Sequence, residues 1–183
     1  MTEEIELIKE IASRLEKAGV EYMMTGSMAM AVYATPRMTR GIDLVIQVSP
    51  EDTSEIVKLF QDDFYIDEAS VRLAVQNRDM FNIIHNECVI KVDFIVRKNE
   101  KYRVEEFSRR QQIDIEGVSI FVVAPEDLIL SKLVWAKESE SELQLKDVRQ
   151  MVTALGSLDD GYLDTWASEL GVEHALARVR KNE

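Results

Sequence analysis

The chain has 183 residues, of which 46% are hydrophobic and 31% charged, so it is long enough for one domain with a substantial core. Its 34 acidic and 22 basic residues give a formal net charge of -12, which disfavours broad non-specific binding to DNA or RNA. A single cysteine excludes an internal disulfide, and no apolar run reaches membrane-spanning length, so we expect a cytoplasmic protein without a membrane partner.

The first fifty residues alternate between helical and extended patterns. Apolar residues recur at helical spacing over residues 3–18, and the short apolar run 20–25 predicts a buried strand. Residues 28–34 are rich in Ala and Met, which predicts a helix that begins directly after Gly26-Ser27. The apolar run 42–48, interrupted by one acid, predicts a second strand.

The middle of the chain is predicted to add another helix and further strands. A helix is expected from Pro50 to Phe60. Residues 62–80 are ambiguous, because they contain both alternating and helical apolar spacings. Residues 81–85 and 89–96 indicate two strands joined by a turn at Asn86-Glu87, and residues 112–115 and 118–123 indicate a further hairpin.

From Pro125 onward the apolar period changes from two to 3.6, which indicates helices. Pro125 suits a helix start, and Glu126-Asp127 supply acids that suit the dipole of the first turn. Further helices are expected at about 142–155, 159–170 and 173–179. The sequence thus predicts an α/β part over residues 1–124 and a helical part over residues 125–183, packed together as one unit.

Two acids lie within apolar strand patterns: Asp43 in residues 42–46 and Asp93 in residues 90–95. A buried carboxylate is costly unless it is paired, hydrogen-bonded or bound to metal, and a divalent cation relieves the repulsion between two of them. Mg²⁺ prefers such carboxylates together with phosphate oxygens and water. The alternative, that each acid simply faces solvent, is equally compatible with the spacing.

The Gly26-Ser27 turn lies between a predicted strand and a predicted helix. Backbone N–H groups at a helix N-terminus suit phosphate, and glycine allows a close approach of the backbone. Gly-Ser is also an ordinary way to begin a helix, so the turn alone does not identify a phosphate site.

The motifs in combination resemble the DNA polymerase β-type nucleotidyltransferase superfamily. The resemblance rests on Thr25-Gly26-Ser27, then residues 37–44, then Val92-Asp93-Phe94. Residues 125–133 and 144–148 are similar to the minimal nucleotidyltransferases of the abortive-infection toxin type. This resemblance implies an α/β (α+β) nucleotidyltransferase fold, in which helices flank a mixed, mostly antiparallel sheet and a helical part follows.

The resemblance also implies residue roles. Gly26 and Ser27 would hold the triphosphate of an NTP substrate, and Asp43 and Asp93 would be catalytic carboxylates and ligands of a Mg²⁺ cofactor. Arg40, Lys132, Lys146 and Asp147 would contribute to nucleotide binding. Arg37 and Arg40 would lie near the phosphates, with a solvated loop as the alternative for both and the favoured one for Arg37. For Lys146 and Asp147 the alternative is an exposed helical face, and for Lys132 it is a lysine whose stem packs on the sheet.

Gly41 departs from the family pattern, which has an acid at this position as the first member of Asp-x-Asp. Without that ligand, transition-state stabilisation would fall by several kcal/mol, on the order of a thousandfold in rate. The sequence leaves open a degenerate binder, a one-metal enzyme and an introduced inactivating change.

Three hypotheses for function follow. The first is transfer of a nucleotidyl group from an NTP to a hydroxyl of an RNA, a protein or a small molecule. The second is a catalytically inactive nucleotide-binding or regulatory module. The third is an interaction protein of the toxin–antitoxin type that uses Trp135, Trp166 and the Met-rich segment 23–30, although such residues more often belong to a core.

Overall fold

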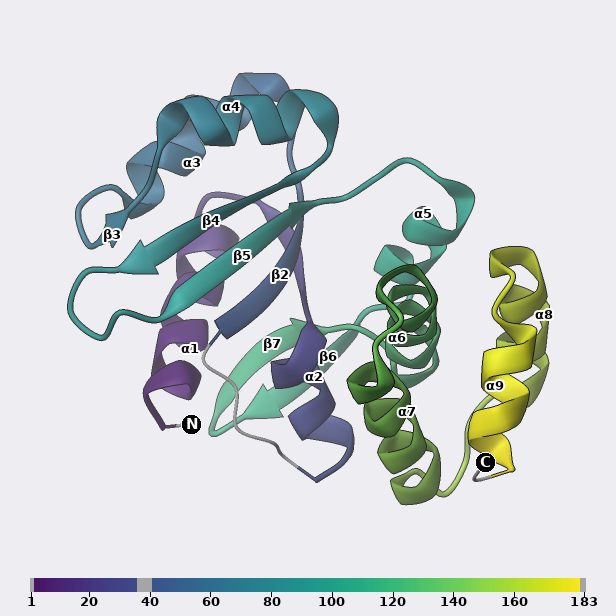
Figure 1. The fold of residues 1–183 in the computed structure, drawn as a ribbon. Coiled ribbons are helices and arrows are strands. Elements are labelled where there is room, and N and C mark those ends of the chain that lie inside the picture. The colour runs from purple at the N-terminus through teal and green to yellow at the C-terminus, as the bar shows by residue number, and fades with distance from the viewer. Residues whose placement is uncertain (1, 36–40, 182–183) are drawn as a thin grey trace.

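The computed structural model describes residues 2–35 and 41–181, which form one open mixed sheet with helices around it (Figure 1). The strand order is β3-β4-β5-β2-β1-β7-β6. Four neighbouring pairs are antiparallel, and β1–β7 and β2–β5 are parallel. The mixed, mostly antiparallel sheet expected from the resemblance is therefore confirmed.

The strands are β1 Glu21–Thr25, β2 Gly41–Gln47, β3 Phe64–Tyr65, β4 Met80–His85, β5 Lys91–Val96, β6 Gln111–Ile115 and β7 Val118–Val122.

The helices divide into those of the α/β part and those of the C-terminal part. In the first part they are α1 Thr2–Lys17, α2 Gly26–Tyr33, α3 Thr53–Phe60, preceded by a 3₁₀ turn at Pro50–Asp52, α4 Glu68–Asn77 and α5 Lys101–Ser108. In the second they are α6 Pro125–Ser139, α7 Glu142–Ala154, α8 Asp160–Leu170 and α9 Glu173–Arg180. No helix in the described ranges is both long and apolar enough to cross a membrane.

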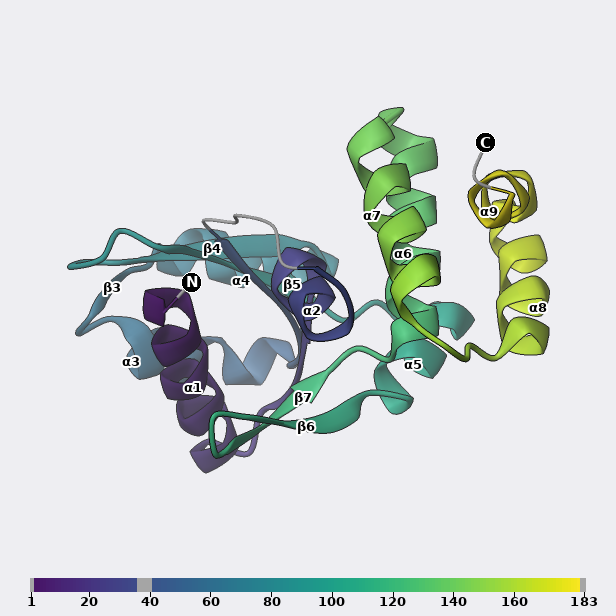
Figure 2. The same ribbon diagram turned by 90° about the horizontal axis from the view of Figure 1, so that it is seen from below.

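The two faces of the central strands differ in composition, because side chains alternate across a sheet. One face carries Ile42, Leu44 and Ile46 from β2 and equally buried residues from β5. Helices α1, α3 and α4 lie on this side (Figure 2), and Phe60 of α3 packs on Phe94 with ring centroids 5.4 Å apart. The other face carries the two strand acids, and α2 and the pair α6–α7 lie beside it.

Most predicted elements are present, with corrected boundaries. Helix α2 begins at Gly26 itself rather than after the Gly-Ser turn. The ambiguous stretch 62–80 contains the short strand β3 and then α4, whose first turn is capped by the Asp67 carboxylate accepting from the Ser70 backbone N–H at 2.8 Å. Helix α5 was not predicted, because only Tyr102, Glu106 and Phe107 of its residues are buried and one of these is charged.

The two tryptophans have different environments. Trp166 is buried against Tyr102 and Tyr162, as expected for a core residue. Trp135 is 53% exposed on α6, so the core alternative does not apply to it. Helix α6 uses its other faces for packing, against α2, α7 and α8, and this leaves the Trp135 ring at the surface.

Candidate functional site

Strands β2 and β5 bring the two strand acids together. The strands are parallel neighbours, and Asp43 is the direct register partner of Asp93. Partners in register project to the same side of a sheet, so the two carboxylates share the face opposite the apolar core. We call them the carboxylate pair. Both residues are partly buried, and the Asp93 side chain is 13% exposed.

The carboxylate pair forms the centre of a polar row across four strands. Thr25 of β1 is the register partner of Asp43, and Asn82 of β4 is the register partner of Asp93. Asn82 is exposed at the outer end of the row. Sequence reasoning missed Asn82, although a polar residue between Phe81 and Ile83 in an alternating strand was a usable signal for a residue on the open face.

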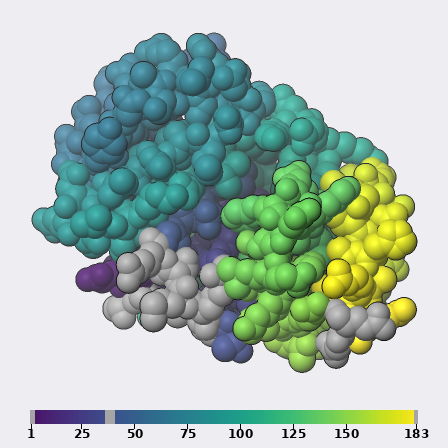
Figure 3. Space-filling view, viewed as in Figure 1, coloured from purple at the N-terminus to yellow at the C-terminus, as the bar shows by residue number. Residues whose placement is uncertain are grey.

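This face is hollowed in the space-filling view. Figure 3 shows a recess between the atoms of β4–β5 and those of α6–α7, with atoms of the early chain at its bottom. A substrate can therefore approach the strand face that carries the carboxylate pair from the side viewed in Figure 3.

Gly26 contacts the carboxylate pair directly. Its backbone has φ +67°, a left-handed conformation that glycine adopts without the steric penalty of a side chain. A Cβ atom at this position would lie only 2.0 Å from Asp43 Oδ2. The next residue, Ser27, donates its backbone N–H to the Asp43 carboxylate. The predicted phosphate turn and the first predicted carboxylate thus meet at one point, the N-terminus of α2.

The charge environment of Asp43 is mixed. Burial raises the pKa of its carboxyl, and the negative charge of Asp93 raises it further. Positive charges on Lys91 and Lys132 and the Ser27 hydrogen bond act in the opposite direction and lower that pKa. The Nζ atom of Lys91 lies 2.8 Å from Asp93 Oδ2, so one member of the carboxylate pair already has a cationic partner from its own strand.

Gly41 lies next to Lys91 on the open face, because the two residues are register partners between β2 and β5. A Cβ atom added to Gly41 would have Lys91 O as its neighbour at 3.5 Å, an ordinary van der Waals contact. The described neighbours of Gly41 therefore leave room for a Cβ atom at this position. Arg37 and Arg40, which the sequence analysis considered near the phosphates, lie outside the described residues.

The donor set is too small for a two-metal centre. In the described ranges, no group of three or more His, Cys, Asp or Glu side chains is arranged to hold a metal ion. Asp43 and Asp93 offer two carboxylates, Gly41 adds none, and Lys91 engages one of the two. These residues fit one Mg²⁺ ion at most, and only with oxygen ligands from a substrate or water.

Lys132 on α6 is buried and makes an ion pair across the helix pair α6–α7. Its Nζ atom lies 2.8 Å from Asp147 Oδ2 and donates to Gln144 Oε1 at 3.1 Å. Its charge also acts on Asp43, which fits a position beside the carboxylate pair. Lys146, by contrast, is exposed on α7, so the structure does not group it with Lys132 and Asp147.

A second acid cluster anchors the N-terminus of α6. We call Tyr102, Arg109, Asp127 and Tyr162 the Asp127 cluster. Asp127 is fully buried and accepts from Arg109 Nε at 2.9 Å and from the Tyr162 hydroxyl at 2.6 Å, while the Tyr102 hydroxyl donates to its backbone oxygen at 3.2 Å. Burial raises the pKa of Asp127, and the bonds from Tyr162 and Arg109 lower it.

The Asp127 cluster joins α5, α6 and α8 and fixes the helix that presents Lys132. Sequence analysis assigned Glu126-Asp127 only to the helix dipole. The burial of Asp127 was not predicted, because its partners come from segments far away in the sequence, one of them next to the unpredicted helix α5.

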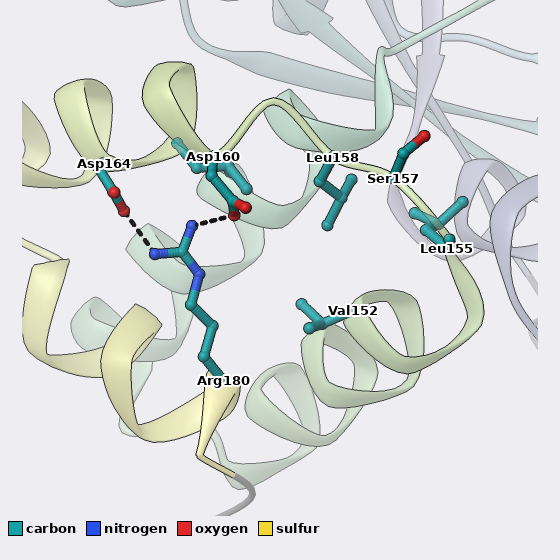
Figure 4. Close-up of a pocket in the computed structure, with 9 residues that line it drawn as sticks. Val152, Leu155, Ser157, Leu158, Asp160, Asp164 and Arg180 are labelled. Carbon is teal, nitrogen blue, oxygen red and sulfur yellow. Dashed lines mark hydrogen bonds and ion pairs between the residues drawn. The ribbon is translucent and has the colours of Figure 1, made fainter.

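A separate cavity of about 720 Å³ lies among α7, α8 and α9 (Figure 4). Val152, Leu155 and Leu158 form its apolar part. Arg180 is paired with Asp160 at 2.6 Å and with Asp164 at 2.5 Å. None of its lining residues belongs to the carboxylate pair or the α2 turn, and its one arginine is already paired with both of its acids, so its size does not make it the candidate site.

Comparison with solved structures gives several similar folds. An antigenic nucleotidyltransferase-like protein from Paracoccidioides brasiliensis is 17% identical with a TM-score of 0.65, over 98% of this chain and 88% of that one. The enzyme ANT(2'')-Ia in complex with adenylyl-2''-tobramycin is 16% identical with a TM-score of 0.56, over 97% and 98%. The lincosamide antibiotic adenylyltransferase LnuA, lincomycin-bound, is 12% identical with a TM-score of 0.53, over 79% and 94%.

These likenesses show that the chain has the nucleotidyltransferase fold, as the motif order implied. No curated protein matches the sequence. The family described as aminoglycoside-2''-adenylyltransferase matches residues 7–134, a segment that contains the carboxylate pair, the α2 turn and the Asp127 cluster apart from Tyr162. Because this match covers more than half of the sequence, the chain belongs to the aminoglycoside-2''-adenylyltransferase family.

Proposed function

We propose that this protein binds an NTP at the N-terminus of α2 and transfers its nucleotidyl group to a hydroxyl of a small molecule. The observation that carries the proposal is the meeting of Gly26-Ser27 with the carboxylate pair on one open sheet face. Free-standing acids and an ordinary helix start would not need this contact. The fold and the family support the same reaction class.

In this reaction the acceptor oxygen attacks the α-phosphorus, the bond to the β-phosphate oxygen breaks, and pyrophosphate leaves. Asp93 takes the proton of the attacking hydroxyl. The backbone N–H groups at the start of α2 orient the phosphates, and Lys132 contributes positive charge near them. A Mg²⁺ ion, held by Asp43 and Asp93, would neutralise phosphate charge when bound.

The acceptor we propose is a small, positively charged molecule that carries hydroxyl groups. Two structural relatives are described with tobramycin and lincomycin derivatives or ligands. A net charge of -12 attracts a cationic small molecule and repels RNA, which argues against a polynucleotide acceptor.

Gly41 makes the native reaction slow. The missing third carboxylate removes a metal ligand that would act in the transition state, at a cost on the order of a thousandfold in rate. Because a Cβ atom at residue 41 makes only an ordinary contact with Lys91 O, Gly41→Asp should recover much of that rate.

The test is transfer of labelled NMP from each NTP to tobramycin or lincomycin with Mg²⁺ or Mn²⁺. We expect Gly41→Asp to exceed the native chain by about a hundredfold or more. The double variant Gly41→Asp/Asp43→Asn is the control, because it must lose the gain if the activity belongs to this site. Absence of transfer by a folded Gly41→Asp protein contradicts the proposal for these acceptors.

A second candidate is a nucleotide-binding module without turnover. It is favoured by Gly41 and by the Lys91–Asp93 ion pair, which together leave the carboxylate pair short of ligands. Calorimetry with NTP and Mg²⁺ distinguishes the two. Binding by both the native chain and Gly41→Asp, with transfer by neither, favours the module over the enzyme.

A further inference from the structure

Lys91 occupies a distinctive position in the polar site. It is on the same strand and the same face as Asp93, two residues away, and it is the register partner of Gly41. Its ammonium group lies 2.8 Å from Asp93 Oδ2, and its charge also lowers the pKa of Asp43. One lysine therefore acts on both members of the carboxylate pair.

The same place in the sheet is where an acid at residue 41 would project. Gly41 is two residues before Asp43 on β2, so a side chain there would share the open face with Lys91 and the carboxylate pair. With glycine at residue 41, the local balance is two carboxylates and one adjacent ammonium group. With an acid there, it would be three carboxylates and the ammonium group, which favours a divalent cation far more.

We infer that Lys91 is a resident counter-cation of the carboxylate pair, and that it prevents free divalent cations from binding there tightly. The inference concerns the site of the proposed function, but it requires neither nucleotide binding nor transfer. A metal ion entering the pair must displace the Lys91 ammonium from Asp93 or accept its repulsion at close range. The Lys91 side chain is 49% exposed, so solvent weakens this effect without removing it.

Gly41 and Lys91 act on the charge of the site in the same direction. Without an acid at residue 41 the site has two negative charges instead of three, and the Lys91 ammonium group neutralises one of these two. The two acids are then held together by a protein cation instead of a bound ion. Divalent ions would enter mainly as the complex with an NTP, whose phosphates supply the missing oxygen ligands.

The experiment measures Mn²⁺ binding to the nucleotide-free protein by electron paramagnetic resonance. The native chain should bind with a Kd in the millimolar range or weaker. Lys91→Met should tighten binding by about tenfold or more, because the repulsion and the competing ion pair are gone. Lys91→Arg keeps a cation and should bind as weakly as the native chain.

Lys98→Met is the matched control, because it removes an exposed lysine just beyond the other end of β5 and should leave the Kd unchanged. Circular dichroism checks the fold of each variant. Micromolar Mn²⁺ binding by the native chain overturns the inference, even if Lys91→Met does not fold. An unchanged Kd in folded Lys91→Met overturns it as well.

The outcome is independent of the proposed function. A failure of Gly41→Asp to transfer NMP would count against the enzyme and leave the Mn²⁺ result as it stands. Tight Mn²⁺ binding by the native chain would show that Lys91 does not keep divalent cations out of the carboxylate pair, and it would not contradict the proposed nucleotidyl transfer. The double variant Gly41→Asp/Lys91→Met tests both changes together, and it should bind Mn²⁺ more tightly than either single variant.

Discussion

The carboxylate pair and the Asp127 cluster both hold acids inside the molecule, but their surroundings differ. Asp127 is fully buried and receives hydrogen bonds from a guanidinium group and a phenol. Asp43 is partly buried, and after burial the next largest influence on its pKa is the repulsion from Asp93. Acids with complete protein partners stabilise the fold, whereas acids that face each other keep binding capacity for a ligand.

Replacement of Asp127 tests the structural half of this comparison and should have the largest effect. Asp127→Ala removes the acceptor of Arg109 Nε and of the Tyr162 hydroxyl, while Arg109 keeps its contact with Glu126 at 3.3 Å. We expect the free energy of unfolding to fall by about 3 kcal/mol. Urea unfolding measures it. Asp164→Ala, which breaks an exposed pair with Arg180, should lose less than about 1 kcal/mol. Equal losses of unfolding free energy in the two variants would mean that the buried Asp127 stabilises the fold no more than the exposed Asp164.

Gly26→Ala tests the contact that links the α2 turn to the carboxylate pair. The added Cβ atom combines a left-handed backbone with a 2.0 Å approach to Asp43 Oδ2, and we expect a loss of about 2–3 kcal/mol. Gly19→Ala is a close control, because Gly19 has φ +69° but nothing within 4 Å of its Cβ position. Only the first variant should also weaken NTP binding, measured by calorimetry. Similar results for both would mean that backbone strain alone matters.

Asp43→Asn should act in the opposite direction from Asp127→Ala. An amide removes the repulsion with Asp93 and can still accept from the Ser27 N–H group, so we expect a gain of up to about 1 kcal/mol in unfolding free energy. Thermal unfolding measures this. A clear loss of stability would place Asp43 among the structural acids.

Glu106 gives the smallest effect, in the pH dependence of stability. Burial raises its pKa, although Arg103 and the Ser131 hydroxyl act against this shift. The folded state therefore binds a proton at pH values where the unfolded state does not, and stability falls as the pH rises through that window. Relative to Glu106→Gln, the native chain should gain stability as the pH is lowered from neutral toward the ordinary titration range of a glutamate carboxyl. A flat difference between the two proteins argues against the raised pKa.

The sequence predicted the elements that carry the site because they have strong local signals. Apolar runs with a single acid marked β2 and β5, and the Gly-Ser turn marked the start of α2. The motif order then implied the fold, and the strand register brought Asp43 and Asp93 side by side as the resemblance required.

What escaped prediction depends on contacts between distant segments. The place of Asn82 in the polar row follows from the pairing of β4 with β5, which no local pattern fixes. The space at Gly41 also required coordinates, because it depends on the neighbouring strand β5. The Lys91–Asp93 ion pair is different, because it joins residues two apart on one predicted strand, and the sequence carried a local signal for it that was missed. The structure shows where the described candidate residues lie, and the roles of all the candidate residues, in catalysis, metal binding and nucleotide binding, remain predictions.

The parallel pairing of β2 with β5 has a consequence for how the molecule forms. Between these strands the chain builds α3, β3, α4 and β4, so the two acids meet only after a long loop has closed. Long-range pairing of this kind is slow, because the loop entropy is lost before the contacts are gained. Electrostatic repulsion between Asp43 and Asp93 therefore arises only once β2 and β5 have paired.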